Sequence, residues 1–556
     1  MKRSTSLSQR VLIVGGVAGG ASCAARLRRL DERAEIVVFD RGPYVSFANC
    51  GLPYYIGEKI TDEKKLLVAD AELFRRRFNI MVHLNTEVLA IDRTEKTIEV
   101  RDLTHGTTRT ERYDELVLAP GATPLRPPLP GIDLPGIFTL RTVPDSRAIR
   151  QWITERRVRR AIVVGGGFIG LEMAENLTHR GLQVTVIEKL DQVMPPLDAE
   201  MAACVADHLR RQNVRLALSE GVTGFEAIPG GLRVTTERGI HEGELVILAI
   251  GVRPETTLAT AAGLKLGPRG GLRVDERMQT SDPDIHAVGD AVEVCDWVGG
   301  APALVPLAGP ANRQGRIAAE AIAGRASSFR GVQGTAICGL FGLQVASTGS
   351  SERRLQQAGA DDYEKIYLQA GHHAGYYPGA QTMLLKLIFR KSDGEILGAQ
   401  AVGGEGVDRR IDIIAMALQK HGTVYDLEEA ELCYAPQFGS ARDPVNLGGM
   451  IAANVLHGEM PVVHWTTAAT GETLFLDVRD GGEWEKERVP GALHIPLDTL
   501  RFRLGELASF TDIRVYCESG QRGYLATRIL NQAGLPARNL SGGLVVRRLL
   551  SGPSPG

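Results

Sequence analysis

The stretch that decides the fold is Arg160-Ala-Ile-Val-Val-Gly165-Gly-Gly-Phe-Ile-Gly170. An apolar run leads into a G-x-G-x-x-G turn, a helical pattern follows over residues 171–180, and a second apolar run over 183–187 ends at Glu188. Such glycines let a strand-to-helix turn approach a pyrophosphate, the helix N-terminus supplies free amides, and the terminal acid binds ribose hydroxyls. The stretch therefore predicts a dinucleotide-binding unit. Glu188 would repel a 2′-phosphate and so favours NADH over NADPH, although Lys189 partly offsets that repulsion.

A related unit lies near the amino terminus. Residues 10–14 are apolar, Gly15-Gly-Val-Ala-Gly-Gly20 forms the turn, residues 21–30 have a helical pattern, and residues 35–39 lead to Asp40. Val17 occupies the position of the middle glycine, so this turn by itself is also consistent with a tight strand–helix connection that binds nothing. Two such units in one chain favour two dinucleotide cofactors.

A third block indicates which cofactor each unit holds. Thr280-Ser-Asp-Pro-Asp-Ile-His-Ala-Val-Gly-Asp290 places an acid just after a buried strand and a glycine, where a carboxylate can accept a ribityl hydroxyl. A lone aspartate of this kind is usually a turn or cap residue, but after two nucleotide units we interpret it as a flavin contact. The first unit would then hold FAD and the second NADH or NADPH. The predicted contacts are Gly15, Ala18, Gly19, Gly20, Asp40, Arg41, Ala119, Gly121, Asp290 and Pro306 for FAD, and Gly165, Gly167, Ile169, Gly170, Glu188 and Gly251 for NAD(P)H.

Length and composition exclude several other classes of protein. A chain of 556 residues is too long for one hydrophobic core, and 44% hydrophobic with 23% charged residues is ordinary for a globular protein. The formal net charge of −2 gives no reason to expect nucleic acid or an anionic membrane as a partner. No window reaches the roughly 18 apolar residues that a membrane span needs. The polar, basic start does not resemble an export signal, so we expect a cytoplasmic protein.

Seven cysteines are scattered along the chain without a C-x-x-C motif, so neither a metal site nor a dithiol redox pair is predicted. Cys50 is distinctive because Ser46-Phe-Ala-Asn-Cys50-Gly-Leu-Pro-Tyr-Tyr55 follows the first nucleotide unit and has no second cysteine within reach. If this thiol meets the flavin, sulfur chemistry proceeds through one cysteine, and a helix N-terminus would favour its ionisation.

Cys517 is the second distinctive thiol. In Ile513-Arg-Val-Tyr-Cys517-Glu-Ser-Gly-Gln-Arg522 a strand ends at the cysteine, and a helix follows from residue 523. The six-residue loop would curl backbone amides around the sulfur, and the helix dipole would help to stabilise a thiolate or persulfide. The alternative is a buried cysteine at a strand end. Glu518 adds negative charge to the loop, which argues against thiosulfate as the sulfur donor. Residues 461–470, which precede this segment, have the composition of a linker.

Residues from about 10 to 460 resemble the two-dinucleotide-domain flavoprotein disulfide reductases, and Ser46-Phe-x-x-Cys50 with the later blocks resembles the single-cysteine coenzyme A-disulfide reductases. Leu474-Phe-Leu-Asp-Val-Arg479, Val489-Pro-Gly-Ala-Leu-His-Ile-Pro496 and the Cys517 loop resemble a single rhodanese domain. The implied fold class is α/β, with two Rossmann-like FAD- and NAD(P)-binding domains, an α+β dimerisation domain and a C-terminal α/β rhodanese domain. The expected boundaries are 8–125 and 256–332 for the two parts of the FAD domain, 126–255 for the NAD(P)H domain, 333–460 for the dimerisation domain and 468–556 for the rhodanese domain.

The same resemblance implies a coenzyme A site and a homodimer whose active sites are shared between subunits. Tyr377 and Tyr434 would reach the sulfur site of the other subunit, where a phenol could protonate a leaving thiolate; by themselves they are consistent with core or turn aromatics. Arg26 and Arg29 would share one helix face with Ser22, and by themselves they are consistent with a solvated face. One family position that usually carries lysine is Phe78 here. The implied substrate contacts are Ser22, Arg26, Arg29, Ser46, Asn49, Arg77, Asn312 and Arg442, and the implied catalytic residues are Cys50, Cys517, Tyr377, Tyr434 and Arg522.

Three functions are compatible with these features. The first is an FAD-dependent enzyme that uses NAD(P)H to reduce coenzyme A persulfide, polysulfide or coenzyme A disulfide through Cys50, with sulfane sulfur handled at Cys517. The second is an NADH oxidase or peroxidase that cycles through a Cys50 sulfenate, which leaves the last domain without a use. The third is a non-reductive sulfur carrier with a flavin redox sensor, which two complete nucleotide units argue against. The fusion favours persulfide, because a reductase of symmetrical disulfides needs no persulfide carrier.

Overall fold

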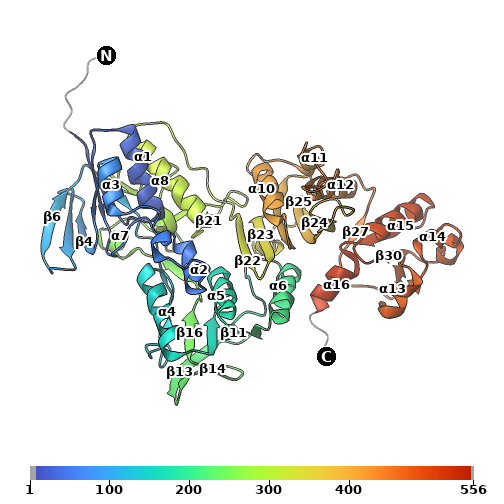
Figure 1. The fold of residues 1–556 in the computed structure, drawn as a ribbon. Coiled ribbons are helices and arrows are strands. Elements are labelled where there is room, and N and C mark those ends of the chain that lie inside the picture. Colours follow the sequence, from blue (N-terminus) through green and yellow to red (C-terminus); the bar gives the residue numbers. More distant parts are fainter. Residues whose placement is uncertain (1–7, 552–556) are drawn as a thin grey trace. The chain divides into compact units, whose positions relative to one another are not determined.

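The computed structural model describes residues 8–551, and its contacts divide the chain into two compact units (Figure 1). The first unit comprises Met1–Asp191 and Asn213–Gly334, and the second comprises Gln192–Gln212 and Thr335–Gly556. This division does not separate the two nucleotide domains, so the boundaries proposed for them remain predictions. Among the helices between residues 8 and 551, none is long and apolar enough to cross a bilayer.

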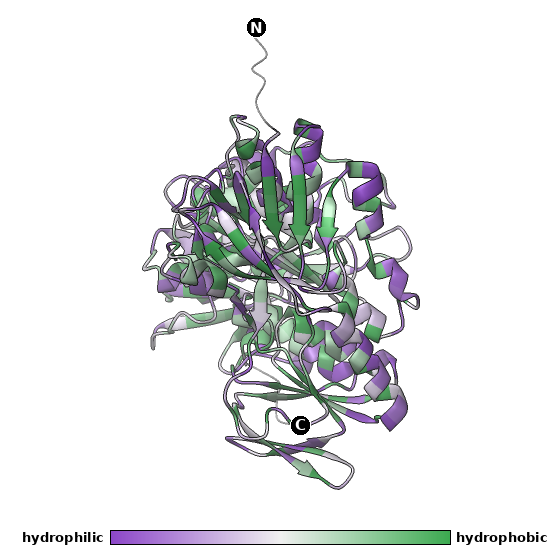
Figure 2. Ribbon diagram, turned by 90° about the vertical axis from the view of Figure 1, so that its left-hand side faces the viewer, coloured by the Kyte–Doolittle hydropathy of each residue, from purple (hydrophilic) through white to green (hydrophobic). Residues whose placement is uncertain are grey.

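A parallel five-stranded sheet forms the core of the amino-terminal nucleotide domain. Its strand order is β19-β7-β1-β2-β3, with all neighbours parallel. Because such a sheet is covered on both faces, its central strand is continuously apolar, and Val11, Leu12 and Ile13 are completely buried. Figure 2 shows such strands in green, the colour of hydrophobic residues. The elements are β1 (Arg10–Val14), β2 (Glu35–Phe39), β3 (Met81–His83), β7 (Glu115–Leu118) and β19 (Ile285–Ala287), with helices α1 (Ala18–Leu30), α2 (Leu52–Ile56), α3 (Ala71–Phe78) and α8 (Ala308–Ile322).

A second parallel sheet has the order β12-β11-β10-β16-β9. The strands and helices predicted around both glycine-rich turns are confirmed. Helix α6 (Ala199–Arg211), which follows β11 in the chain, is grouped with the second unit. The other elements are β9 (Ile137–Phe138), β10 (Arg160–Val164), β11 (Gln183–Glu188), β12 (Arg215–Leu218) and β16 (Leu245–Leu248), with helices α4 (Val143–Arg156) and α5 (Phe168–His179).

Smaller elements complete the first unit. They form two antiparallel three-stranded sheets, one mixed three-stranded sheet and one antiparallel pair of strands. Their strands are β4 (Thr86–Asp92), β5 (Thr97–Asp102), β6 (Thr108–Arg112), β8 (Ala122–Pro124), β13 (Val222–Ile228), β14 (Gly231–Thr236), β15 (Ile240–Gly243), β17 (Val252–Pro254), β18 (Leu272–Arg273), β20 (Val292–Cys295) and β21 (Pro302–Ala303), with helix α7 (Thr257–Ala261).

An antiparallel sheet of order β22-β23-β26-β25-β24 begins the second unit. Strand β24 is at its edge, and β25 and β26 are almost wholly buried. The elements are β22 (Ala336–Leu340), β23 (Leu343–Gly349), β24 (Tyr363–Gly371), β25 (Thr382–Arg390) and β26 (Ile396–Gly403), with helices α9 (Glu352–Gln357), α10 (Val407–Leu418), α11 (Val424–Glu428) and α12 (Pro444–Leu456).

A parallel sheet of order β27-β31-β30-β28-β29 forms the last part of the chain. The linker predicted over 461–470 was wrong in part, because β27 lies in this segment and pairs with β31. A strand of two residues is too short to show the alternation that identifies strands in a sequence. The elements are β27 (Val462–Val463), β28 (Thr473–Asp477), β29 (Leu493–His494), β30 (Asp512–Tyr516) and β31 (Ala537–Leu540), with helices α13 (Gly481–Lys486), α14 (Leu497–Leu500), α15 (Gln521–Gln532) and α16 (Gly543–Ser551).

Candidate functional site

The two glycine-rich turns have the same geometry. Gly15 has a φ of +94°, and a Cβ there would lie 2.2 Å from the carbonyl oxygen of Ala119. Gly165 has a φ of +111°, and a Cβ there would lie 2.3 Å from the carbonyl oxygen of Ala249. Both positions therefore exclude a side chain. A Cβ at Gly167 would stand in open space, so the second turn leaves room for a pyrophosphate to approach its backbone.

The two terminal acids also correspond. Asp40 accepts hydrogen bonds from the amides of Gly16 at 2.9 Å and Gly42 at 2.8 Å. Glu188 accepts in the same way from the amide of Gly166 at 2.7 Å and from the amide two residues downstream at 2.8 Å. Each carboxylate is thus fixed beside its turn, where it can accept ribose hydroxyls. These residues fit two dinucleotide cofactors, one at each turn.

Asp290 is held near the first turn by α8 and a neighbouring arginine. Gln314 accepts a hydrogen bond from the amide of Gly289 at 2.7 Å, which fixes the turn that carries Asp290. Burial raises the pKa of Asp290, and Arg141 opposes this effect. Arg141 also donates to the carbonyl oxygen of Pro120 at 3.0 Å. No sequence motif includes Arg141, because it lies in the connection between β9 and α4.

Ser46 ties the Cys50 stretch to the first glycine-rich turn. Its φ of +48° is left-handed, which is uncommon for a residue other than glycine. The Ser46 amide donates to the carbonyl of Gly16 at 2.8 Å, and its carbonyl accepts from the amide of Val68 at 2.9 Å. A backbone held in this region by its surroundings is a feature found at functional sites.

Cys50 is a free and exposed cysteine in the 3-10 turn Asn49–Gly51, directly before α2. The side-chain oxygen of Asn49 accepts from the Cys50 amide at 3.0 Å and lies 3.7 Å from the sulfur. Although the residue is exposed, desolvation of its sulfur raises the pKa of Cys50, and the carboxylates of Glu172 and Asp290 raise it further. These groups oppose ionisation of Cys50, and the expectation that the N-terminus of α2 favours its thiolate stays a prediction.

Glu172 is an acid near Cys50 that the motifs did not identify. It lies on α5, and α5 packs against α2. Burial raises the pKa of Glu172 to about 7, and the hydroxyl of Tyr54 donates to its carboxylate at 3.4 Å. A carboxyl group that exchanges its proton near neutral pH therefore acts on Cys50 from the helix that follows the second glycine-rich turn.

The predicted substrate contacts on α1 meet α8. Ser22 hydrogen-bonds the side chain of Asn312. The Nε of Arg26 donates to Glu320 at 3.1 Å, and Arg316 contacts the same carboxylate at 3.1 Å. The charge of Arg26 is therefore partly neutralised within the protein.

The other predicted basic contacts differ in exposure and position. Arg29 and Arg77 are exposed in the first unit, and Arg442 is exposed in the second. Phe78 packs against Phe74 with ring centroids 6.1 Å apart and joins the core, so no cation is available at that position.

Tyr434 meets Tyr376, the neighbour of the tyrosine that the sequence favoured. The two hydroxyl groups lie 3.1 Å apart, and both side chains are exposed. Tyr377 instead packs the edge of its ring against His373, with centroids 5.5 Å apart. The role predicted for Tyr377 stays a prediction, and Tyr376 becomes the second candidate beside Tyr434. Adjacent tyrosines in one turn cannot be distinguished without the turn's geometry.

Cys517 has the surroundings that the sequence predicts. It follows β30 directly and is 1% exposed. The amides of Gly520 and Gly523 donate to its sulfur at 3.1 and 3.4 Å, and α15 begins within the same loop. Two amide donors and a helix N-terminus can stabilise negative charge on the sulfur.

Both charged side chains of the Cys517 loop are paired with residues outside it. Arg522 contacts Glu483 with a bidentate pair at 2.6 and 2.7 Å. Glu518 accepts from Arg548 at 2.6 and 2.8 Å. Because Arg548 offsets the charge of Glu518, the argument from Glu518 against thiosulfate is weaker.

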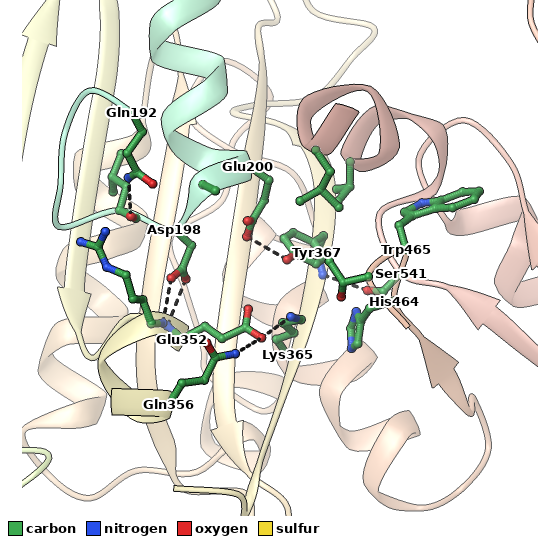
Figure 3. Close-up of a pocket in the computed structure, with 16 residues that line it drawn as sticks. Gln192, Asp198, Glu200, Glu352, Gln356, Lys365, Tyr367, His464, Trp465 and Ser541 are labelled. Atoms are coloured by element: carbon green, nitrogen blue, oxygen red, sulfur yellow. Dashed lines mark hydrogen bonds and ion pairs between the residues drawn. The ribbon is translucent and has the colours of Figure 1, made fainter. Parts of the chain in front are cut away.

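A cavity of about 320 Å³ in the second unit adjoins a buried ion cluster (Figure 3). Lys386 has no exposed side-chain surface, and its Nζ lies 2.8 Å from Asp198, 2.5 Å from Glu200 and 3.0 Å from Glu352. These three carboxylates lie close enough together to bind a metal ion. The ammonium group already lies among them, so we interpret the cluster as a buried ion network that joins α6 to the antiparallel sheet.

Two dinucleotide folds, one isolated thiol beside the first of them and a second thiol in an amide-lined loop define a dinucleotide-dependent oxidoreductase with two sulfur sites. Residues 9–315 match the family model of pyridine nucleotide-disulphide oxidoreductases, residues 335–444 match the dimerisation domain of that family, and residues 463–546 match a rhodanese-like domain. The chain belongs to the pyridine nucleotide-disulphide oxidoreductase family, and it is an NAD(P)H-dependent flavin oxidoreductase.

Individual relatives confirm the resemblance to coenzyme A-disulfide reductases. A coenzyme A disulfide reductase of Staphylococcus haemolyticus is 35% identical over 449 residues, which cover 80% of this chain and 100% of that protein. The crystal structure of reduced Bacillus anthracis CoADR-RHD has a TM-score of 0.96 and 46% identity, covering 98% of this chain and 99% of that one. An NAD-dependent persulfide reductase from A. fulgidus has a TM-score of 0.90 and 37% identity, covering 97% of this chain and 100% of that one.

Proposed function

We propose that this chain is a homodimeric FAD-dependent reductase that uses NADH to reduce coenzyme A persulfide or polysulfide through Cys50, while Cys517 carries sulfane sulfur. The observation that carries the proposal is the combination in one chain of an isolated, exposed thiol and a buried thiol held by two loop amides. Coenzyme A disulfide is the related substrate of the same chemistry. The relatives named above, a coenzyme A disulfide reductase and an NAD-dependent persulfide reductase, support both substrate classes.

The preference for NADH rests on Glu188. Its carboxylate is fixed by two backbone amides, so it cannot turn away from the ribose site without losing both hydrogen bonds. A 2′-phosphate there would meet a fixed negative charge. Coenzyme A, a polyanion, would be held by the exposed Arg29 and Arg77, with Ser22 and Asn312 supplying polar contacts.

The proposed reaction begins with the Cys50 thiolate. Its sulfur attacks the coenzyme A sulfur of the persulfide, the S–S bond breaks, hydrosulfide leaves, and Cys50 forms a mixed disulfide with coenzyme A. FAD, when bound, supplies the electron pair taken from NADH that cleaves this disulfide to coenzyme A thiol and Cys50 thiolate. The hydroxyl groups of Tyr376 and Tyr434 of the partner subunit would donate the proton to the coenzyme A sulfur as it leaves Cys50.

The test is anaerobic NADH oxidation by the purified protein, comparing coenzyme A persulfide with coenzyme A disulfide and assaying released sulfide. Faster turnover of the persulfide with stoichiometric sulfide supports the proposal, and faster turnover of the disulfide makes the protein a thiol-disulfide reductase. Cys50→Ser should abolish turnover with either substrate but leave reduction of the bound flavin by NADH. Consumption of oxygen or peroxide with neither sulfur substrate would establish an oxidase or peroxidase instead.

A further inference from the structure

The first backbone amides of α16 hydrogen-bond the backbone of the Cys517 loop. The amides of Leu544 and Val545 donate to the carbonyl oxygens of Cys517 at 2.9 Å and Glu518 at 3.1 Å. A Cβ on Gly543 would lie 2.4 Å from the Cys517 carbonyl oxygen, so this close approach requires glycine. Because α16 fixes the first two carbonyl groups of the loop, it fixes the course of the backbone that brings the amide donors to the sulfur.

Two side chains hold the start of α16. The indole N–H of Trp465 donates to the carbonyl oxygen of Gly543 at 2.7 Å. The same ring packs edge-on against Tyr516, the residue before Cys517, with centroids 5.8 Å apart. The hydroxyl of Ser541 accepts from the backbone amide of Tyr367 at 3.2 Å. Trp465 therefore contacts the residue before the Cys517 loop and the start of the helix that holds this loop.

Ser541, and His464 next to Trp465, contact the sheet of strands β22 to β26, here called the dimerisation sheet. Tyr367 lies on β24, an edge strand whose outward amides have no neighbouring strand to bond. Ser541 satisfies one of these amides, and His464, adjacent to Trp465, hydrogen-bonds Glu364 of the same strand at 2.8 Å. Figure 3 shows Tyr367, His464, Trp465 and Ser541 together at the cavity. Contacts therefore run without interruption from the sheet edge to the sulfur loop.

We propose that Trp465 and Ser541 are positioning residues for Cys517, which they act on through α16 from the edge of the dimerisation sheet. This inference rests on the proposed sulfur transfer at Cys517 and extends it to residues outside the loop. Trp465 and Ser541 are together called the clamp, because they hold the helix that positions the Cys517 loop. The sulfur chemistry of the last domain then depends on contacts with the dimerisation sheet.

The reaction step that the clamp should affect is sulfur loading. The Cys517 thiolate attacks the outer sulfur of a persulfide R–S–SH, a new S–S bond forms, the S–S bond of the donor breaks, and R–S⁻ leaves. No net oxidation occurs, and the proton remains on the terminal sulfur of the protein persulfide. Amides aimed at the attacking sulfur stabilise the Cys517 thiolate, so a displaced loop should slow this step by lowering the fraction of thiolate.

The experiment uses the full-length Trp465→Phe protein with cysteine persulfide as the sulfur donor. Phenylalanine keeps an aromatic ring in place but removes the N–H donor to Gly543. The rate at which the Cys517 peptide gains one sulfur atom is followed by mass spectrometry across a range of pH. We expect loading to slow about tenfold and its pH profile to move to higher pH, because the sulfur loses aligned donors.

Trp152→Phe is the matched control, because the Trp152 indole also donates to a backbone carbonyl, that of Glu244, at 3.0 Å in the first unit. It should lower the melting temperature by a similar amount and leave Cys517 loading unchanged. Ser541→Ala should slow loading about threefold, and it decides the question if Trp465→Phe does not fold. Wild-type loading rates in both clamp variants would overturn the inference. A wild-type protein that never gains sulfur at Cys517 would overturn the proposed function of that thiol as well.

Discussion

Replacing Lys386 by methionine measures how firmly α6 is joined to the dimerisation sheet. The side chain has no exposed surface, and its Nζ lies within 3.0 Å of carboxylates from Asp198, Glu200 and Glu352. Methionine fills a similar volume but leaves these buried carboxylates without the ammonium group. Removing one partner from a buried ion cluster costs about 3–5 kcal/mol, because the remaining charges stay desolvated.

Glu352 gives a second, independent magnitude. Burial would raise the pKa of Glu352, but the ammonium groups of Lys386 and Lys365 outweigh burial and hold this pKa at about 2, against an ordinary value of 4.5. The depressed pKa corresponds to about 3 kcal/mol of stability. That contribution is present above the unfolded-state pKa and is lost as the pH falls from about 4.5 towards 2. Part of this contribution comes from Lys365, which Lys386→Met leaves in place, so the share of Glu352 in the loss is smaller than about 3 kcal/mol.

The assay is thermal unfolding at neutral pH followed by circular dichroism. At about 2–4 °C per kcal/mol for a unit of this size, a loss of about 3–5 kcal/mol should lower the melting temperature of Lys386→Met by about 6–20 °C. The difference should shrink below about pH 4.5, where the wild-type protein loses the contribution of Glu352. Lys59→Met is the control, because Lys59 is 46% exposed and its pair with Glu175 spans 3.3 Å, which is worth less than about 1 kcal/mol. If Lys386→Met and Lys59→Met have the same melting temperature, the reasoning is refuted.

Four further substitutions test the reductase half. Tyr376→Phe should slow persulfide turnover about tenfold or more in steady-state assays, and Tyr377→Phe less than about twofold, because Tyr376 carries the hydroxyl contact. Glu188→Ala should lower the kcat/KM ratio of NADH over NADPH about tenfold; an unchanged ratio would contradict the assignment of the ribose site. Glu172→Gln should allow iodoacetamide to alkylate Cys50 at lower pH, because ionised Glu172 raises the pKa of Cys50. Peptide mass spectrometry from about pH 6 to 9 measures this shift, and identical profiles would exclude that coupling.

The parts of the molecule that the sequence predicts well are those in which the chemistry is local along the chain. Gly165 and Glu188 belong to one strand–turn–helix–strand segment, and the amides around Cys517 come from the six residues that follow it. Motifs of this kind carry their geometry in residue spacing, so the fold class and the amide donors around Cys517 can be predicted from them. The same locality explains why the strands around the two turns were placed correctly.

The residues that the sequence does not reveal depend on packing between distant segments. Glu172 influences Cys50 only because α2 and α5 pack together, and Arg141 reaches Asp290 from a connection without a motif. Trp465 lies in a segment whose composition is that of a linker, yet its indole bonds Gly543, far along the chain. Propensity and periodicity carry no signal for such contacts, because they arise only when the tertiary fold brings the segments together.

The protein opposes a negative charge on Cys50 and favours a negative charge on Cys517. This difference indicates which of the two thiols has a neighbouring group that titrates near neutral pH. The negative charge on Cys50 is opposed by desolvation and by two carboxylates, one of which, Glu172, has a pKa of about 7. The donors to Cys517 are backbone amides, which do not titrate. Protonation of Glu172 as the pH falls through about 7 removes one repulsive charge from the Cys50 site and leaves the Cys517 donors unchanged. If the rate of the overall reaction changes near neutral pH because a neighbouring group titrates, we therefore expect that group to be Glu172 beside Cys50.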